Sequence, residues 1–171
     1  CTFWHFRFDA DADMKMAAMT DVIAKDKKVQ KVYLINQDYS FGKAVAAAAN
    51  KMLAEKRADI KIVGDELHPL QKVNDFSPYV AKIKAAGADT VITGNWSNDM
   101  VLLIKAGKDA GLKVAWETYY GGTPGTVTAI GEAGDHGRLD EMSPLEFGSL
   151  DLPEAVRRGI HDAGFVSATP I

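Results

Sequence analysis

The sequence predicts an α/β fold, a mostly parallel sheet with helices on both faces. Short apolar runs typical of buried strands are centred near Val32, Ile62, Val91 and Val114, and segments with helical spacing lie between them. Strands and helices that alternate at this rhythm are most simply connected as βαβ units, whose strands lie parallel. The 171 residues are 47% hydrophobic, which is enough to build a substantial core.

The N-terminal part predicts a strand followed by a helix. Residues 3–8 alternate in polarity and carry aromatic side chains, which is typical of a strand. Asp9, Asp11 and Asp13 supply carboxylates of the kind that cap helices, so a helix is expected from there to about Lys25. Its apolar positions at helical spacing are Met14, Ala17, Ala18 and Val22.

The same alternation continues along the chain. In order, the expected elements are a strand at 32–35, a loop at 36–42, an alanine-rich helix to about 57, a strand at 60–66, a helix at 76–86, a strand at 90–93, a helix at 98–110, a strand at 113–117 and a short helix at 124–131. Gly87 and Gly111 each stand between a helix and the next strand, where the left-handed conformation that ends many helices favours glycine.

The pattern changes after about Ala133, which divides the chain into a lobe at residues 1–133 and a polar linker with a helical tail at residues 134–171. Residues 135–138 are polar and typical of a turn. Pro153 follows Asp151 at a position that suits the first turn of a helix, so a short C-terminal helix is expected from there to about Ala163.

Composition limits the expected partners. The net charge is −3, so no nucleic-acid partner is expected. No apolar run is long enough to cross a bilayer, so no membrane insertion is expected. Residues 1–7 lack the charged and apolar pattern of a secretory signal. The single cysteine, Cys1, cannot form a disulfide within the chain.

Three predicted loops at one edge of the sheet carry the candidate ligand-binding residues. In open parallel sheets ligands bind outside the carboxyl ends of the strands, and the loops there are 36–42, 94–99 and 118–123. The candidates are Tyr39, Phe41, Asn95, Trp96, Ser97, Tyr119 and Tyr120. Aromatic rings would form a wall for a small solute, while hydroxyls and the amides of the helix from Asn98 would orient its polar groups. The alternative is that these aromatics plug the end of the sheet or face a partner domain.

No arrangement of residues indicates catalysis, a metal site or a cofactor, so we expect no enzyme. His5, His68, His136 and His161 are isolated in the sequence, and surface or loop positions are expected for all four. The aspartates at positions 9, 11 and 13 lack the glycine and the distal glutamate of a calcium loop, so helix capping is their expected role. The glycine-rich stretch at 121–125 lacks the lysine of a phosphate-binding loop.

Four blocks of the sequence carry a family resemblance. They are Phe6-Arg7 with Asp11, residues 31–42 (KVYLINQDYSFG), residues 75–89 (DFSPYVAKIKAAGAD), and residues 116–122 (WETYYGG) leading to 129–131. Together they resemble the second lobe of the type I periplasmic solute-binding proteins of ABC transporters, of the branched-chain amino acid type, over residues 1 to about 133.

This resemblance implies a function. A small solute, such as a branched-chain amino acid or an amide, would be held between two lobes in the periplasm and delivered to an ABC-transporter permease. By position, Tyr39 or Phe41, Trp96 and Tyr120 would line the cleft. Leucine-type members commonly place an acidic residue near the position of Tyr120, where it meets the ligand amine. Because the first lobe is not among these residues, we expect solute binding by this chain alone to be impaired.

The C-terminal tail carries a second resemblance. Residues 147–153 (FGSLDLP) and 164–171 (GFVSATPI) resemble the Q motif at the start of a DEAD-box RNA helicase core, over residues 140–171, and the chain ends before the glutamine of that motif. The alternative is a generic amphipathic helix that ends in a Gly-Phe turn. For the whole chain, the alternatives to a solute-binding lobe are a truncated or fused reading frame with a helicase N-terminal piece, or an enzyme on a doubly wound sheet.

Overall fold

The computed structural model describes residues 9–130, 145–146 and 167–168. Several expectations lie outside the described residues: the strand at 3–8, the helix from residue 151 and the positions of three of the four histidines. Most of the segment that resembles the Q motif also lies outside them. Two short strands that the sequence did not predict, β5 (Leu145–Glu146) and β6 (Ser167–Ala168), pair antiparallel with each other.

The main sheet has four parallel strands in the order β2-β1-β3-β4, which confirms the predicted fold class. Their bounds are β1 Lys31–Gln37, β2 Lys61–His68, β3 Thr90–Thr93 and β4 Ala115–Thr118. The two central strands are buried at every residue except Lys31, because helices cover both of their faces. The edge strand β2 is only partly buried.

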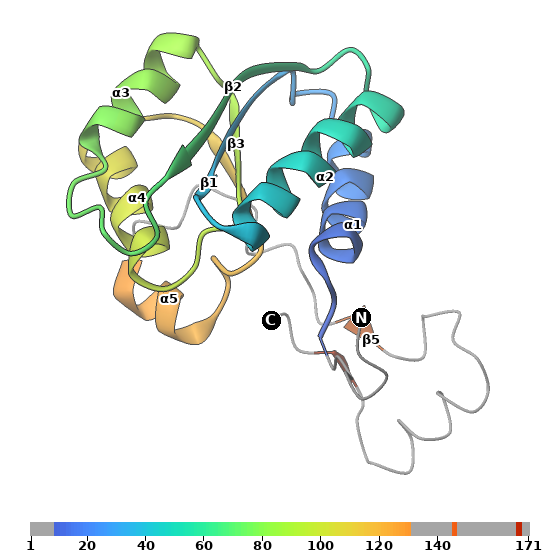
Figure 1. Cartoon of the computed structure of the whole chain (residues 1–171). Helices are drawn as coiled ribbons and strands as arrows, with labels where there is room; N and C mark the ends of the chain where they lie inside the picture. The colour runs from blue at the N-terminus through green and yellow to red at the C-terminus, as the bar shows by residue number, and fades with distance from the viewer. Residues whose placement is uncertain (1–8, 131–144, 147–166, 169–171) are drawn as a thin grey trace.

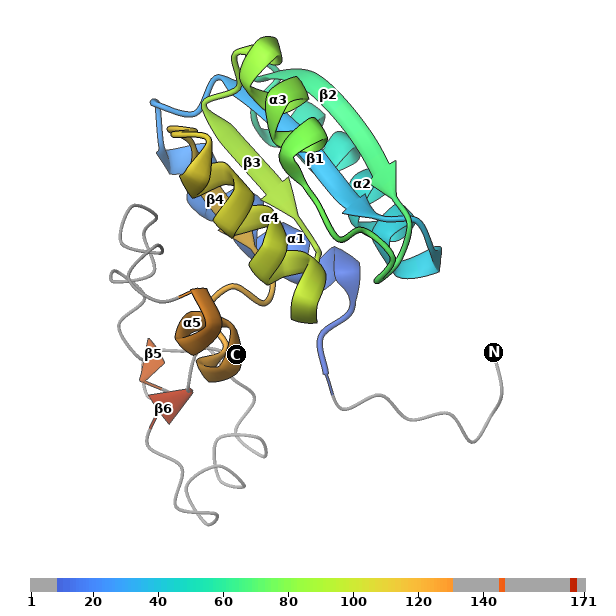
Figure 2. The same ribbon diagram turned by 90° about the vertical axis from the view of Figure 1, so that its left-hand side faces the viewer.

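Helices lie on both faces of the sheet, as Figures 1 and 2 show. On one face, α1 (Ala12–Lys25) and α2 (Ser40–Lys56) pack over inward side chains such as Leu34 and Ile92. On the other face, α3 (Ser77–Ala86) and α4 (Ser97–Asp109) pack over the alternate set, including Tyr33, Ile35 and Val91. The short helix α5 (Pro124–Ile130) packs through Ile130 against Met100 and Ile104 of α4. Within the described part of the chain, no helix has the length and apolar character needed to span a bilayer.

Helix ends follow the capping chemistry expected from the sequence. Asp11 is the N-cap of α1, where its side chain accepts a hydrogen bond from Met14 N at 2.8 Å. Gly87 and Gly111 have φ of 65° and 62°, so both adopt the predicted left-handed conformation. Arg57, the C-cap of α2, is buried and donates to the carbonyls of Ile23, Asp26 and Val29. This arginine therefore ties the end of α1 to the end of α2.

The buried face of α1 differs from the apolar positions noted in the sequence. Met14 and Val22 are 63% and 51% exposed, whereas Met16, Thr20 and Ile23 are buried. Thr20 occupies this face at little cost because its hydroxyl donates to Met16 O at 2.7 Å within the helix. Because the buried face of α1 includes the polar Thr20, the apolar residues in the sequence indicated a face rotated by part of a turn from the one that is buried.

The expected loop at 36–42 is much shorter than predicted. Strand β1 continues to Gln37 and α2 begins at Ser40, so only two residues join them. Asn36 and Gln37 stay in the strand by pairing with Leu67 and His68 of β2, and the Asn36 side chain accepts a hydrogen bond from Gly94 N at 2.8 Å. The first turn of α2 also lies very close to the strand end: a Cβ at Gly42 would stand 1.9 Å from Gln37 O. Only glycine fits there.

Candidate functional site

Aromatic side chains from all three predicted loops meet at the carboxyl edge of the sheet. Trp96 Nε1 donates a hydrogen bond to Tyr39 Oη at 2.8 Å. The ring centroid of Phe41 lies 6.0 Å from that of Tyr39 and 6.3 Å from that of Tyr120. Residues that are far apart in the sequence thus form one aromatic rim, as expected for the end of a parallel sheet.

A cavity of about 470 Å³ lies between the start of α4 and the segment that follows β4. Trp96, Ser97, Asn98 and Val101 line one side, and the other side is lined by Tyr120, Thr123, Gly125, Thr126 and Ala129. None of these residues is charged. The wall combines aromatic rings with hydroxyl and amide groups, which suits a small solute with an apolar part and a few hydrogen-bonding groups.

Two of the expected ligand-binding residues are buried and hydrogen-bonded within the lobe. Asn95 is fully buried, and its Nδ2 donates to His68 Nε2 at 2.8 Å. Tyr119 is only 8% exposed, and its hydroxyl donates to Ala12 O at 2.8 Å, which fixes the start of α1. Burial, with smaller contributions from Asp13 and other nearby groups, raises the pKa of Tyr119 above its ordinary value.

The expected surface or loop position of His68 is wrong. Strand β2 runs on to this residue, whose ring is completely buried and packs edge-on against Phe76 at a centroid distance of 4.9 Å. Its Nδ1 lies 3.2 Å from Pro69 O, so a ring with its hydrogen on Nδ1 satisfies both this contact and the one from Asn95. The histidine is a hydrogen-bonded core residue.

Sequence analysis missed a buried polar network beneath the rim. Asp99, in the first turn of α4, is 1% exposed, and its Oδ2 accepts hydrogen bonds from Gln37 Nε2 at 2.7 Å and from Gln71 N at 2.8 Å. Among the residues that the structure describes, the only non-glycine residues with positive φ are Gln71 and Ser97. Gln71 donates its backbone N–H to this carboxylate, which therefore stabilises the strained backbone at Gln71, and Ser97 lies two residues before Asp99 in the first turn of α4. The only signal in the sequence was a polar Asn-Gln pair at the end of an apolar strand.

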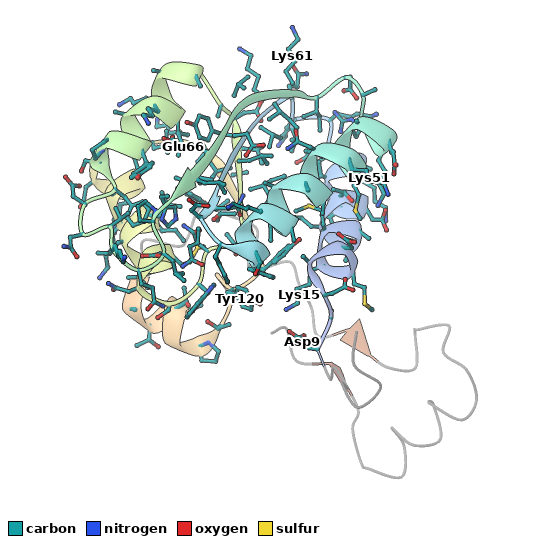
Figure 3. The ribbon with its side chains drawn as sticks, viewed as in Figure 1. Asp9, Lys15, Lys51, Lys61, Glu66 and Tyr120 are labelled. Atoms are coloured by element: carbon teal, nitrogen blue, oxygen red, sulfur yellow. The ribbon has the colours of Figure 1, made fainter. Side chains whose placement is uncertain are left out.

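Sequence analysis also missed a cation at the rim. Lys15 Nζ donates to Tyr120 Oη at 3.2 Å and to Asp9 Oδ2 at 2.7 Å, and it stands 4.8 Å from the centroid of the Tyr120 ring. Figure 3 shows the three side chains together at one end of the molecule. Desolvation lowers the pKa of Lys15, but the hydrogen bonds with Asp9 and Tyr120 outweigh it, so the pKa lies above its ordinary value.

The described residues contain no group of three or more histidine, cysteine, aspartate or glutamate side chains placed to hold a metal ion. Two of the three N-terminal aspartates have other roles: Asp11 caps α1 and Asp9 pairs with Lys15. Asp13 is exposed in the first turn of the same helix, where a carboxylate is favourable.

Comparisons with known proteins identify the family and the fold of the chain. Residues 1–139 match the periplasmic binding protein family. The Leu/Ile/Val-binding protein homolog 4 of Brucella abortus (strain 2308) is 44% identical over 137 residues, which are 78% of this chain and 31% of that protein. The crystal structure of a leucine-, isoleucine-, valine-, threonine- and alanine-binding protein from Brucella ovis, in a closed conformation, superposes with a TM-score of 0.67 at 40% identity, over 78% of this chain and 34% of that one.

A third similar structure is a solute-binding protein of an ABC transporter from Rhodopseudomonas palustris HaA2, in complex with p-hydroxybenzoic acid. It has a TM-score of 0.60 and 25% identity, over 90% of this chain and 41% of that one. The fold and the family match together define a periplasmic-binding-protein-like lobe, and the chain belongs to the periplasmic binding protein family. It spans about a third of the length of the two Brucella relatives.

Proposed function

We propose that this chain provides one wall of the binding site of a periplasmic solute-binding protein, which captures a small solute for uptake by an ABC-transporter permease. The observation that carries the proposal is the aromatic rim of Tyr39, Trp96 and Tyr120 at the carboxyl edge of the sheet, beside a cavity whose described lining carries no charge. Its volume of about 470 Å³ is in the range of small-molecule sites.

The candidate residues divide into two groups by position. Trp96, Ser97 and Tyr120 line the cavity and would contact the solute directly. Tyr39 and Phe41 contact these residues: the Tyr39 hydroxyl accepts the hydrogen bond from Trp96, and the Phe41 ring packs against Tyr120. The helix α4 starts at the cavity wall, so its first amides would supply further hydrogen-bond donors.

The relatives indicate two solute classes. The Brucella proteins support a branched-chain or other small aliphatic amino acid. The Rhodopseudomonas protein supports an aromatic acid as the second candidate. No acidic side chain occurs among the described residues that line the cavity, which favours the second class because a ligand ammonium finds no carboxylate among them.

Ligand-observed saturation-transfer NMR tests the proposal with leucine, isoleucine, valine and 4-hydroxybenzoate, and with glucose as an unrelated solute. Because the described wall contacts one side of a solute, we expect binding of the 171-residue chain to be no tighter than about millimolar. Trp96→Ala should abolish the signal. Val127→Ser, an exposed change on the neighbouring α5, should preserve it. Equal signals from glucose, or binding that survives Trp96→Ala, would contradict the proposed site.

A further inference from the structure

The hydrogen bonds around Tyr120 fix which polar group its hydroxyl can offer. A phenol has one hydrogen to donate and oxygen lone pairs to accept. The Lys15 ammonium donates to this oxygen at 3.2 Å, so a lone pair is already occupied. No acceptor for the Tyr120 hydroxyl hydrogen occurs among residues 9–130. The hydroxyl hydrogen is therefore not used within these residues, and Tyr120 is one of the residues that line the cavity.

The charges around the cavity also favour a ligand group that is negatively charged. Among the described residues that line it, no charged side chain would pair with a cation. Lys15, whose ammonium is hydrogen-bonded to Tyr120, would repel a ligand ammonium placed at this tyrosine. The N-terminus of α4, whose residues Ser97 and Asn98 line the opposite wall, also favours negative charge.

We propose that the cavity receives the carboxylate of its solute, rather than the ammonium, at the hydroxyl of Tyr120, and that Lys15 is the residue that sets this preference. This inference rests on the proposed function, because it assumes that the aromatic rim is a solute site. It adds the class of group that the site recognises: a carboxylate that accepts the Tyr120 hydroxyl hydrogen in a charge-assisted bond.

Lys15 is held in place for this role by its neighbours. Asp9 Oδ2 accepts from its ammonium at 2.7 Å, and this carboxylate is more than half exposed, so solvent screens its charge. The helix that carries Lys15 is anchored beside the rim by the bond from Tyr119 to Ala12 O. Loss of the Asp9 charge should therefore strengthen the preference for a carboxylate.

Two probes with the same branched apolar group test whether the cavity prefers a carboxylate or an ammonium. These are 3-methylbutanoate, which has only a carboxylate, and 3-methylbutan-1-amine, which has only an ammonium. Each is titrated into the 15N-labelled full chain at neutral pH, and binding is followed by the Trp96 indole signal, assigned with Trp96→Phe. The variants are Lys15→Met, Lys15→Arg and Tyr120→Phe. Lys25→Met, at the far end of the same helix, is the control with the same change in net charge.

We expect the carboxylate probe to bind wild type about tenfold more tightly than the amine, as for one charge-assisted hydrogen bond. Lys15→Met should reduce this ratio to near one, and Tyr120→Phe, which removes the donor but keeps Lys15, should reduce it in part, while Lys15→Arg and Lys25→Met should retain it. If Lys15→Met fails to fold by circular dichroism, Tyr120→Phe carries the test. A ratio near one in wild type, tighter binding of the amine, or a ratio unchanged in Tyr120→Phe would overturn the inference and leave the solute site standing. If neither probe perturbs wild type, the proposed function and this inference both fail.

Discussion

Replacing Asp99 with alanine should destabilise the fold more than any other single change at the rim. The carboxylate is buried, and removing it leaves the Gln37 amide hydrogen without its acceptor, which costs about 1–3 kcal/mol. The bond from Gln71 N contributes about 1 kcal/mol more, and an acidic group in the first turn of α4 about 0.3–1 kcal/mol. The desolvation of the carboxylate, which alanine avoids, acts in the opposite direction.

The net loss that we expect is about 2–4 kcal/mol in the free energy of unfolding. Urea denaturation should show it as a midpoint about 1–2 M lower with an unchanged slope. Asp109→Ala is the matched control, because that carboxylate is exposed at the other end of α4, where a negative charge is unfavourable. A double-mutant cycle with Gln37→Met should give a coupling of about 1 kcal/mol or more. If Asp99→Ala unfolds like Asp109→Ala, the network does not hold the rim.

Three further changes test the local packing. Gly42→Ala should lower the free energy of unfolding by about 2 kcal/mol or more, because the added Cβ would clash with the carbonyl of Gln37. Gly125→Ala, whose Cβ would meet nothing within 4 Å, should not destabilise the fold. Thermal melts compare the two variants. Tyr119→Phe should cost about 1 kcal/mol or more through the lost hydrogen bond to the start of α1, which amide hydrogen exchange would localise to that helix. The side-chain hydrogen bond from Arg57 lowers the pKa of Asp59 from 3.8 to about 2, so the stabilisation by this pair is present above pH 4 and is lost as the pH falls toward 2. Asp59→Asn should therefore weaken the fall in unfolding free energy over this acidic range. An unchanged fall would contradict this pairing.

The sheet could be predicted because its signals are local. Each strand is a short apolar run, and two of the intervening helices end before glycines that take the left-handed conformation. The boundaries that failed depended on long-range contacts instead. Strand β1 extends through Asn36 because this residue pairs with Leu67 of β2, and no local pattern signals this partner. The buried face of α1 was not recognised because it includes Thr20, a polar residue whose hydroxyl donates to Met16 O within the helix.

The candidate site was predictable to the level of its loops but not of its side chains. Topology alone brings the loops of Tyr39, Trp96 and Tyr120 to one edge. Whether a loop residue faces the cavity or the core is decided by its partners, which place Asn95 against His68. Lys15 was missed because it lies 105 residues before the tyrosine that it contacts.

The most direct test of the central claim is a chemical-shift map of the 15N-labelled chain titrated with leucine and, separately, with 4-hydroxybenzoate to tens of millimolar. We predict that at least one of these solutes shifts the amides of residues 96–98 and 120–126, on the two sides of the cavity, while amides on the outer faces of α1 and α3 stay unchanged. Shifts concentrated on those outer faces, or no shifts with either solute, would contradict a solute site at the aromatic rim.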